Sequence, residues 1–310
     1  MFEILLDELH EKGIEISVVH GKLFFEGPEQ YITDELLEKL RTNKSNLIKH
    51  FWPLKNSNLL PINPVGNKPP VILLHGERGN YYFSEYFGND QPFYGFLHLG
   101  SDGEKVKIRT VEEFAEEYIK QILATVPKGP LIVGGFSFGG IIAYEMACRL
   151  KEHGYEVAML IMVDCISPLH KGRIFKKGLF NKVKRYFLGP MRRFLKKRIQ
   201  LTIAKAYLLV DKPIPISRRS FYILANYGRA NARYKPGKYD GNVLLFRANT
   251  NLCDVYSLGW DKLVNGKIEI IDFEGDHKSI IEDSENAKMF TIKILQKIME
   301  IQKINETSKG

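Results

Sequence analysis

The ten residues Leu131-Ile-Val-Gly-Gly-Phe-Ser-Phe-Gly-Gly140 decide the fold. An apolar run leads into the pattern Gly135-x-Ser137-x-Gly139, and an amphipathic helical pattern follows it. A strand that turns directly into a helix holds its middle residue in a strained conformation, which flanking glycines allow by letting the neighbouring segments pack closely. The serine hydroxyl is then exposed at the start of a helix, where backbone N–H groups favour negative charge. We therefore predict that Ser137 is a nucleophile.

Strands and helices alternate on both sides of this turn. The candidate strands are Val71–Leu74, Phe93–Phe96, Leu131–Phe136, Val157–Asp164, Asn242–Ala248 and Lys267–Phe273. The candidate helices between and after them are Thr110–Thr125, Gly140–His153 and Asn286–Gln302. Several strands are apolar throughout, as strands covered on both faces must be. The alternation predicts an α/β fold with a mostly parallel sheet over residues 70–304.

A histidine is needed to take the proton of the serine hydroxyl. After a turn of this kind the histidine is expected late in the chain, beyond the last strand. His277, in Phe273-Glu-Gly-Asp-His277, occupies that place and is predicted to be the base. His75 lies in the first strand-to-helix turn, near the same edge of the sheet, and is predicted to be structural.

A carboxylate must orient this histidine and stabilise its charged form. Asp164 ends the strand after the nucleophile's helix, whereas Asp254 lies in the loop after the next strand, 23 residues before His277. Either topology can bring an acid to the same histidine, so chain position leaves both open. Asp276 adjoins His277, points the wrong way for this role and is expected to organise the loop.

Two backbone N–H groups are expected to stabilise the oxyanion that forms during attack on a carbonyl. One belongs to Phe138, which directly follows the nucleophile. The other is assigned to Glu77, in the first strand-to-helix turn His75-Gly-Glu-Arg-Gly79.

Residues 1–52 have a pattern of their own. Apolar residues at helical spacing end at Gly13, two short alternating segments flank His20-Gly21, and Thr33 is a good N-cap for a helix. A last short helix is expected at Ser45–Phe51. The order helix, hairpin, helix, helix predicts a small α+β domain. The four prolines of residues 53–69 predict a semi-extended linker to the main domain.

Positive charge is concentrated in one segment. Residues 165–210 hold thirteen Lys or Arg residues and no Asp or Glu, and subtracting these charges from the net charge of +9 leaves −4 for the rest. The segment interrupts the strand and helix alternation, and we predict a helical lid at about residues 168–235. Such a run is either a solvated helix face or a docking surface for an acidic partner. Nucleic acid is the weaker interpretation, because the aromatic residues among the basic ones also suit amphipathic helices.

The apolar runs, the N-terminus and the cysteines indicate the cellular compartment. No apolar run is long enough to span a bilayer, and the N-terminus has neither a basic region nor an uninterrupted apolar stretch. The three cysteines show no C-x-x-C spacing. These features predict a cytoplasmic protein with reduced thiols, and no membrane partner. No metal or organic cofactor is implied.

Residues 69–300 resemble the thioesterase domains that end nonribosomal peptide and polyketide assembly lines, which have the α/β-hydrolase fold. The likeness rests on LLHG, GGFSFGG, LIMVDCISP, YKPGKYDGNVLLFRA, LGW at Leu258–Trp260, and FEGDH. In that family the acid usually follows the strand after the nucleophile's helix, which implies Asp164. In the related editing thioesterases it follows the next strand, which would imply Asp254. LIMVD is the better match, so the resemblance favours Asp164.

Residues 1–52 resemble the N-terminal docking domain named for the tubulysin synthetase TubC. The likeness rests on the element order, on Gly13-Ile14-Glu-Ile16 and on Gly21-Lys-Leu23. In that family the hairpin binds a short segment at the C-terminus of an upstream enzyme by strand addition.

These resemblances imply a thioesterase that releases an acyl or peptidyl chain from a phosphopantetheinyl carrier protein, by hydrolysis or cyclisation. Because the sequence shows no carrier domain of its own, we expect it to meet a carrier in trans, with the docking domain raising the effective concentration. The alternatives are an editing thioesterase that clears misacylated carriers, a generic esterase or lipase, and a non-catalytic docking adaptor.

Overall fold

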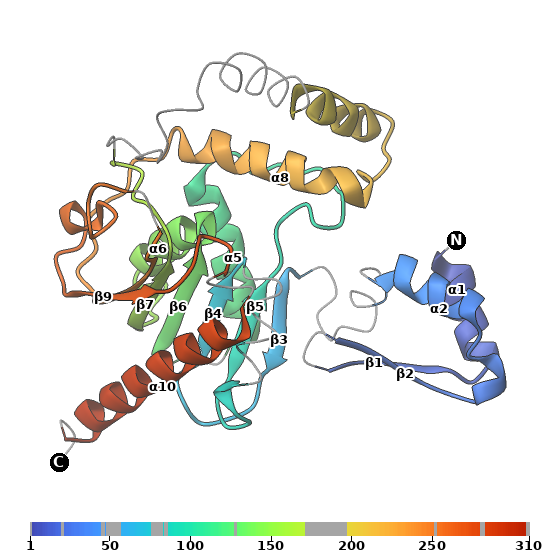
Figure 1. Ribbon diagram of the computed structural model, residues 1–310, viewed down its shortest axis with the longest axis horizontal. Coiled ribbons are helices and arrows are strands. Elements are labelled where there is room, and N and C mark those ends of the chain that lie inside the picture. Colours follow the sequence, from blue (N-terminus) through green and yellow to red (C-terminus); the bar gives the residue numbers. More distant parts are fainter. Residues whose placement is uncertain are drawn as a thin grey trace.

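The computed structural model shows a seven-stranded sheet flanked by helices and a small N-terminal unit (Figure 1). The structure describes residues 2–19, 22–44, 47, 57–75, 83, 86–126, 129–170, 197–250, 253–279 and 283–307. Among these residues, no helix combines the length and the apolar character that crossing a bilayer requires.

The sheet has the strand order β3-β5-β4-β6-β7-β8-β9. Its strands are β3 (Leu59–Asn63), β4 (Val71–Leu74), β5 (Phe93–Phe96), β6 (Leu131–Phe136), β7 (Val157–Val163), β8 (Val243–Ala248) and β9 (Ile268–Phe273). β3 is antiparallel to β5, and every other neighbouring pair is parallel. The α/β class and the six predicted strands are therefore confirmed, and all their carboxyl ends meet at one edge.

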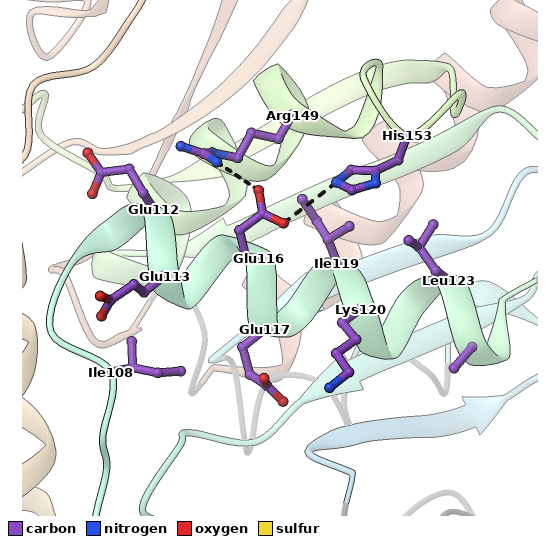
Figure 2. A pocket seen from close by; sticks show the side chains of 11 residues that line it. Ile108, Glu112, Glu113, Glu116, Glu117, Ile119, Lys120, Leu123, Arg149 and His153 are labelled. Carbon is purple, nitrogen blue, oxygen red and sulfur yellow. Dashed lines mark hydrogen bonds and ion pairs between the residues drawn. The ribbon is translucent and has the colours of Figure 1, made fainter.

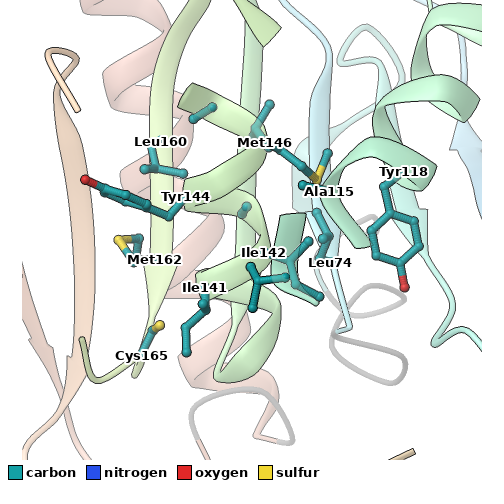
Figure 3. Close-up of a cluster of buried hydrophobic side chains, with 14 of the residues drawn as sticks. Leu74, Ala115, Tyr118, Ile141, Ile142, Tyr144, Met146, Leu160, Met162 and Cys165 are labelled. Atoms are coloured by element: carbon teal, nitrogen blue, oxygen red, sulfur yellow. The ribbon is translucent and has the colours of Figure 1, made fainter. Parts of the chain in front are cut away.

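Helices cover both faces of this sheet. The apolar side chains of α5 (Val111–Thr125) and α6 (Phe138–Leu150) pack in one core cluster on one face. α10 (Ser284–Thr307) packs on the other face through a separate cluster that includes Phe290 and Ile294. Figure 3 shows Ile141, Ile142 and Tyr144 of α6 among the buried side chains of the first cluster.

α5 begins at a capping box. The Thr110 side chain accepts a hydrogen bond from the Glu113 N–H, and the Glu113 carboxylate accepts one from the Thr110 N–H. These reciprocal bonds satisfy backbone donors that a helix start otherwise leaves open, and they fix the place where the chain enters the helix.

The predicted linker over residues 53–69 is wrong for Leu59–Asn63, because these residues form the edge strand β3. Leu59, Leu60 and Ile62 are buried, and they extend the core beyond the predicted boundary. Proline cannot donate to a sheet ladder, so Pro61 signals a linker in the sequence. It is tolerated here because, in the described part of the chain, β3 pairs on one side only, with a register shift between Pro61 and Asn63.

The N-terminal unit has the predicted order of elements as far as it is described. It comprises α1 (Phe2–Glu11), β1 (Glu15–Val19), β2 (Lys22–Glu26), the 3-10 turn η1 (Glu29–Tyr31) and α2 (Asp34–Thr42). The Thr33 side chain accepts a hydrogen bond from the Leu36 N–H, as expected of an N-cap. Its own small core comprises Leu5, Leu9, Ile14, Leu36, Leu40 and Leu47. The predicted helix at 45–51 lies outside the described residues except for Leu47.

The described part of the predicted lid contains two helices. A helix at 197–209 is followed by α8 (Ile216–Asn231), while residues 171–196 lie outside the described part. Tyr227 of α8 stacks on Phe138, at the start of α6, with ring centroids 4.4 Å apart. α8 therefore lies over the carboxyl edge of the sheet (Figure 1).

Candidate active site

Ser137 stands between the end of β6 and the start of α6. Its backbone has φ 55° and ψ −120°, a strained conformation for a residue that carries a side chain. A Cβ atom on Gly135 would lie 2.3 Å from the carbonyl carbon of Gly139, and one on Gly139 would lie 2.7 Å from the Leu74 oxygen. The two glycines are therefore required for strand and helix to approach this closely, and this approach presents Ser137 at the sheet edge.

His277 follows β9 and faces the serine. Its Nε2 lies 3.1 Å from the Ser137 Oγ, and its ring packs against Phe136 with centroids 4.6 Å apart. The Asp276 carboxylate accepts hydrogen bonds from the backbone N–H groups of Lys278 and Ser279, at 2.9 and 3.0 Å. These bonds lower the pKa of Asp276. Asp276 thus organises the loop that carries His277, as the sequence indicated.

Asp164 lies directly after β7 and contacts the other nitrogen of the same imidazole. Its Oδ2 is 2.7 Å from His277 Nδ1, and the side chain of Asp164 is 2% exposed. Its Oδ1 accepts a hydrogen bond from the Ala248 N–H at 3.2 Å, and its own backbone N–H donates to the Phe246 oxygen at 2.7 Å. The neighbouring strand β8 therefore holds both the backbone and the side chain of Asp164.

The three side chains form one hydrogen-bonded chain, from Ser137 through His277 to Asp164. A carboxylate only accepts hydrogen bonds, so His277 Nδ1 donates to Asp164. The neutral ring then has its lone pair on Nε2, where it accepts the hydroxyl proton of Ser137. The His277 side chain is 48% exposed, so the reacting end of the chain is open to an entering molecule.

Asp254, the other candidate acid, contacts a different histidine. Its Oδ1 lies 2.9 Å from His170 Nε2. Of the two carboxylates that the sequence left open, the structure brings Asp164 to His277 and directs Asp254 to His170.

Of the two predicted oxyanion donors, Phe138 belongs to the described part of the chain. Phe138 is the first residue of α6, where backbone N–H groups have no partner within the helix, so its N–H is suited to an anion beside Ser137. Glu77 lies outside the described residues.

A buried aromatic cluster beneath the lid was not indicated as a unit by the sequence. The Tyr227 hydroxyl lies 2.7 Å from His98 Nδ1 and 3.2 Å from His75 Nε2, and the latter atom is also 2.8 Å from the Tyr118 hydroxyl. Burial lowers the pKa of His98 to about 4, and burial together with the neighbouring His98 holds the pKa of His75 well below its ordinary value. Both rings are therefore neutral near pH 7, which matches the structural role predicted for His75. His98 lies two residues after Phe96, where the candidate strand ends, and this position was its one sequence signal.

One groove lies away from these residues. It has a volume of about 940 Å³ and runs along the outer face of α5. Figure 2 shows Glu116 on this face paired with Arg149 and His153, at 2.7 and 3.6 Å. None of the residues that line it belongs to the Ser137, His277 and Asp164 chain.

Comparison of the sequence with known protein families shows to which family the chain belongs. The sequence pattern of the thioesterase domain matches residues 89–297, which is more than half of the chain. The chain belongs to the thioesterase domain family. The pattern of the TubC N-terminal docking domain matches residues 3–52 of the same thioesterase chain.

Related proteins of known class are synthases of much greater length. The dimodular nonribosomal peptide synthase of Bacillus subtilis (strain 168) is 27% identical over 298 residues, covering 89% of this chain and 12% of the synthase. Malpibaldin synthetase of Mortierella alpina is 28% identical over 235 residues, covering 71% of this chain and 4% of the synthetase. The thioesterase chain therefore corresponds to a small part of these proteins.

Solved structures share the fold. The holo form of AB3403, a four-domain nonribosomal peptide synthetase bound to AMP and glycine, gives a TM-score of 0.62 at 23% identity, over 85% of this chain and 21% of that chain. The NocB thioesterase domain, in covalent complex with a fluorophosphonate nocardicin G analogue, gives 0.57 at 22% identity, over 77% and 99%. With the family matches, these likenesses identify a thioesterase domain of the nonribosomal peptide and polyketide synthetase type, preceded by a docking domain.

Proposed function

We propose that this thioesterase releases an acyl or peptidyl chain from the phosphopantetheinyl thiol of a carrier protein, through an acyl-enzyme on Ser137. The observation that carries the proposal is the hydrogen-bonded chain from Ser137 Oγ through His277 to Asp164, at 3.1 and 2.7 Å. A serine, a histidine and a buried aspartate in this order are the residues that nucleophilic acyl transfer requires.

In the first step, Ser137 Oγ attacks the thioester carbonyl while His277 Nε2 takes the hydroxyl proton. Asp164 stabilises the imidazolium, and the N–H groups of Phe138 and Glu77 stabilise the oxyanion. When the oxyanion collapses, the carbon–sulfur bond breaks and His277 returns the proton to the leaving carrier thiol. Water, or an amine or hydroxyl of the same chain, then attacks the acyl-enzyme, which gives a free acid or a ring. These steps require no metal or organic cofactor.

The releasing role is favoured over the editing role by the placement of the acids. The resemblance associates editing with an acid at Asp254, and Asp254 contacts His170 instead of His277. Asp164, the acid associated with release, is the one that contacts His277.

The upstream partner is proposed to bind the N-terminal hairpin. Among the described residues, β1 and β2 pair only with each other, so each presents one edge for a further strand. Strand addition by a C-terminal segment of an upstream synthetase would use these edges. It would also raise the effective concentration of a carrier near the thioesterase.

A cationic pocket beside the lid supports an acidic carrier as the second partner. The pocket has a volume of about 380 Å³ and lies between the loop before α5, the helix at 197–209 and α8. Its basic lining residues are Lys105, Arg109, Lys205, Arg229 and Arg233. In the part of the chain that the structure describes, none of them has a carboxylate within 4.0 Å of its side-chain nitrogens. Asn226 also lines the pocket, is 7% exposed and has a buried Nδ2 without a hydrogen-bond partner.

Charge reversal at the pocket tests the carrier partner. Lys205 and Arg233 are exposed, so Lys205→Glu with Arg233→Glu leaves the core intact. We expect kcat/KM for a carrier-bound acyl chain to fall about 10-fold or more at low salt, because steering by charge acts on association. Turnover of a short synthetic thioester should not change, and Lys120→Glu, at an exposed position on α5, should change neither. Equal losses on both substrates would contradict the carrier assignment.

Comparison of substrates tests the reaction. The proposal predicts that a carrier-bound acyl thioester is cleaved with a higher kcat/KM than the matching oxygen ester. A preference for the oxygen ester would favour a generic esterase. The absence of turnover on every ester by a folded protein would favour a docking adaptor.

A further inference from the structure

Three metal-ligating side chains meet outside the Ser137, His277 and Asp164 chain. His170 Nε2 lies 2.9 Å from Asp254 Oδ1 and 3.4 Å from Cys253 Sγ, and the three ligand atoms are all within 4.8 Å of one another. His170 comes from the segment after β7, whereas Cys253 and Asp254 come from the loop after β8. The cluster therefore joins two separate segments at the carboxyl edge of the sheet, at the base of the lid.

The cluster is built into the structure. The His170 side chain is 9% exposed, Cys253 is 8% exposed, and the Asp254 side chain is 36% exposed. The His170 N–H donates to the Ser167 oxygen, and the Ser167 N–H donates to the Leu258 oxygen, at 3.0 and 2.9 Å. Gly259, in a left-handed conformation with φ 83°, allows the His170 side chain to pack so closely that an added Cβ would lie 3.0 Å from it. His170 is thus held with its Nε2 toward the two other groups.

Hydrogen bonds of His170 Nε2 alone cannot satisfy both groups that it meets in this cluster. A neutral imidazole nitrogen carries either one proton or one lone pair. Nε2 therefore makes one full hydrogen bond, yet it faces both a carboxylate and a sulfur atom. A cation placed between the three groups would interact with all of them.

The donor set and its spacing suit a divalent transition metal. Imidazole nitrogen, thiolate sulfur and carboxylate oxygen are the ligands of Zn²⁺. With bonds of about 2.0–2.3 Å, neighbouring ligands of a tetrahedral Zn²⁺ lie about 3.3–3.7 Å apart. The separation of 3.4 Å from Cys253 falls in that range, and the 2.9 Å from Asp254 requires a small movement of an exposed carboxylate.

The other two cysteines are unsuited to such a site. Burial raises the pKa of Cys148 to about 12 and holds the pKa of Cys165 well above its ordinary value. Both thiols stay protonated near neutral pH, and metal binding requires the thiolate. Cys253 is the cysteine that has a histidine and a carboxylate beside it.

We propose that His170, Cys253 and Asp254 bind one divalent metal ion of the Zn²⁺ class. Three protein ligands leave a fourth position for water. The ion links the segment that enters the lid to the loop after β8, and it takes no part in the proposed acyl transfer.

Cobalt binding tests this site directly, because thiolate-bound Co²⁺ absorbs in the near ultraviolet and tetrahedral Co²⁺ absorbs strongly in the visible range. We expect the metal-stripped full chain to bind one equivalent of Co²⁺ with both absorptions, and Zn²⁺ to displace it and raise the melting temperature. Cys253→Ser should remove the near-ultraviolet absorption, and His170→Gln should weaken binding at least 10-fold. Cys148→Ser, the matched control, should retain the wild-type spectrum.

Two results would overturn the proposal. One is a wild-type protein that takes up no Co²⁺ with thiolate absorption. The other is a near-ultraviolet absorption that survives in Cys253→Ser. Far-ultraviolet circular dichroism establishes that each variant is folded. If Cys253→Ser does not fold, Asp254→Asn takes its place, with at least 10-fold weaker Co²⁺ binding expected and unchanged affinity contradicting the site.

Discussion

The buried histidine His98 makes the stability of this thioesterase depend on pH. Its pKa is lowered to about 4 by burial, from an ordinary value of 6.5. Below pH 6.5 the unfolded chain therefore takes up a proton that the folded protein does not, until the pH nears 4. Stability must fall as the pH falls through this window, because the unfolded state binds more protons there. Above pH 6.5 this contribution is flat.

The size of the effect follows from the two pKa values. For a single group shifted in this way, lowering the pH from about 7.5 to about 5.5 costs about 1 kcal/mol of unfolding free energy. His75 adds to it in the same direction, since its pKa is also lowered by burial. His98→Gln removes the His98 part while keeping a polar group beside the Tyr227 hydroxyl, which lies 2.7 Å from His98 Nδ1.

Urea unfolding at the two pH values measures this difference. We expect the wild type to lose about 1 kcal/mol more than His98→Gln between about pH 7.5 and 5.5, because the variant lacks the imidazole whose pKa is lowered. Proton NMR provides a second readout, in which the His98 ring of the folded wild type should stay neutral at about pH 5.5. Equal losses in the two proteins, together with a His98 ring that titrates near its ordinary pKa, would refute the reasoning.

Two further predictions concern the site and its supporting turn. Asp164→Asn should lower kcat about 10⁴-fold, because the amide favours the wrong tautomer of His277, while Asp254→Asn should lower it less than about 10-fold; steady-state kinetics decides, and the reverse order would make Asp254 the acid. Gly135→Ala places a Cβ 2.3 Å from the Gly139 carbonyl carbon and should cost about 3 kcal/mol or more of unfolding free energy. Gly129→Ala meets no atom within 4 Å and should change it by less than about 0.5 kcal/mol; equal effects of the two changes in urea unfolding would contradict the packing argument.

The sheet was predictable from the sequence because strands covered on both faces are apolar throughout. β4, β6 and β7 follow this rule, and the structure agrees with the predicted bounds to within one residue. α6 begins at Phe138, two residues before its predicted start at Gly140. Glycine is a poor helix former, and the glycines of this first turn are kept because strand and helix approach so closely there.

Other features depend on contacts that local patterns do not contain. β3 was missed because Pro61 signals a linker, and only pairing with β5 makes it an edge strand. The choice between Asp164 and Asp254 required knowing which carboxylate lies beside His277, and both follow parallel strands that end at the same edge. The contact of His98 with Tyr227 joins residues 129 positions apart, so neither residue indicates the other.

The most direct test of the central claim is whether Ser137 is an activated nucleophile. Intact-protein mass spectrometry after incubation with a fluorophosphonate measures this for the wild type and for Ser137→Ala. We expect a single adduct on the folded wild type that is absent from the Ser137→Ala protein. A folded wild type without an adduct, or an adduct that persists in Ser137→Ala, would contradict the assignment of Ser137 as the nucleophile.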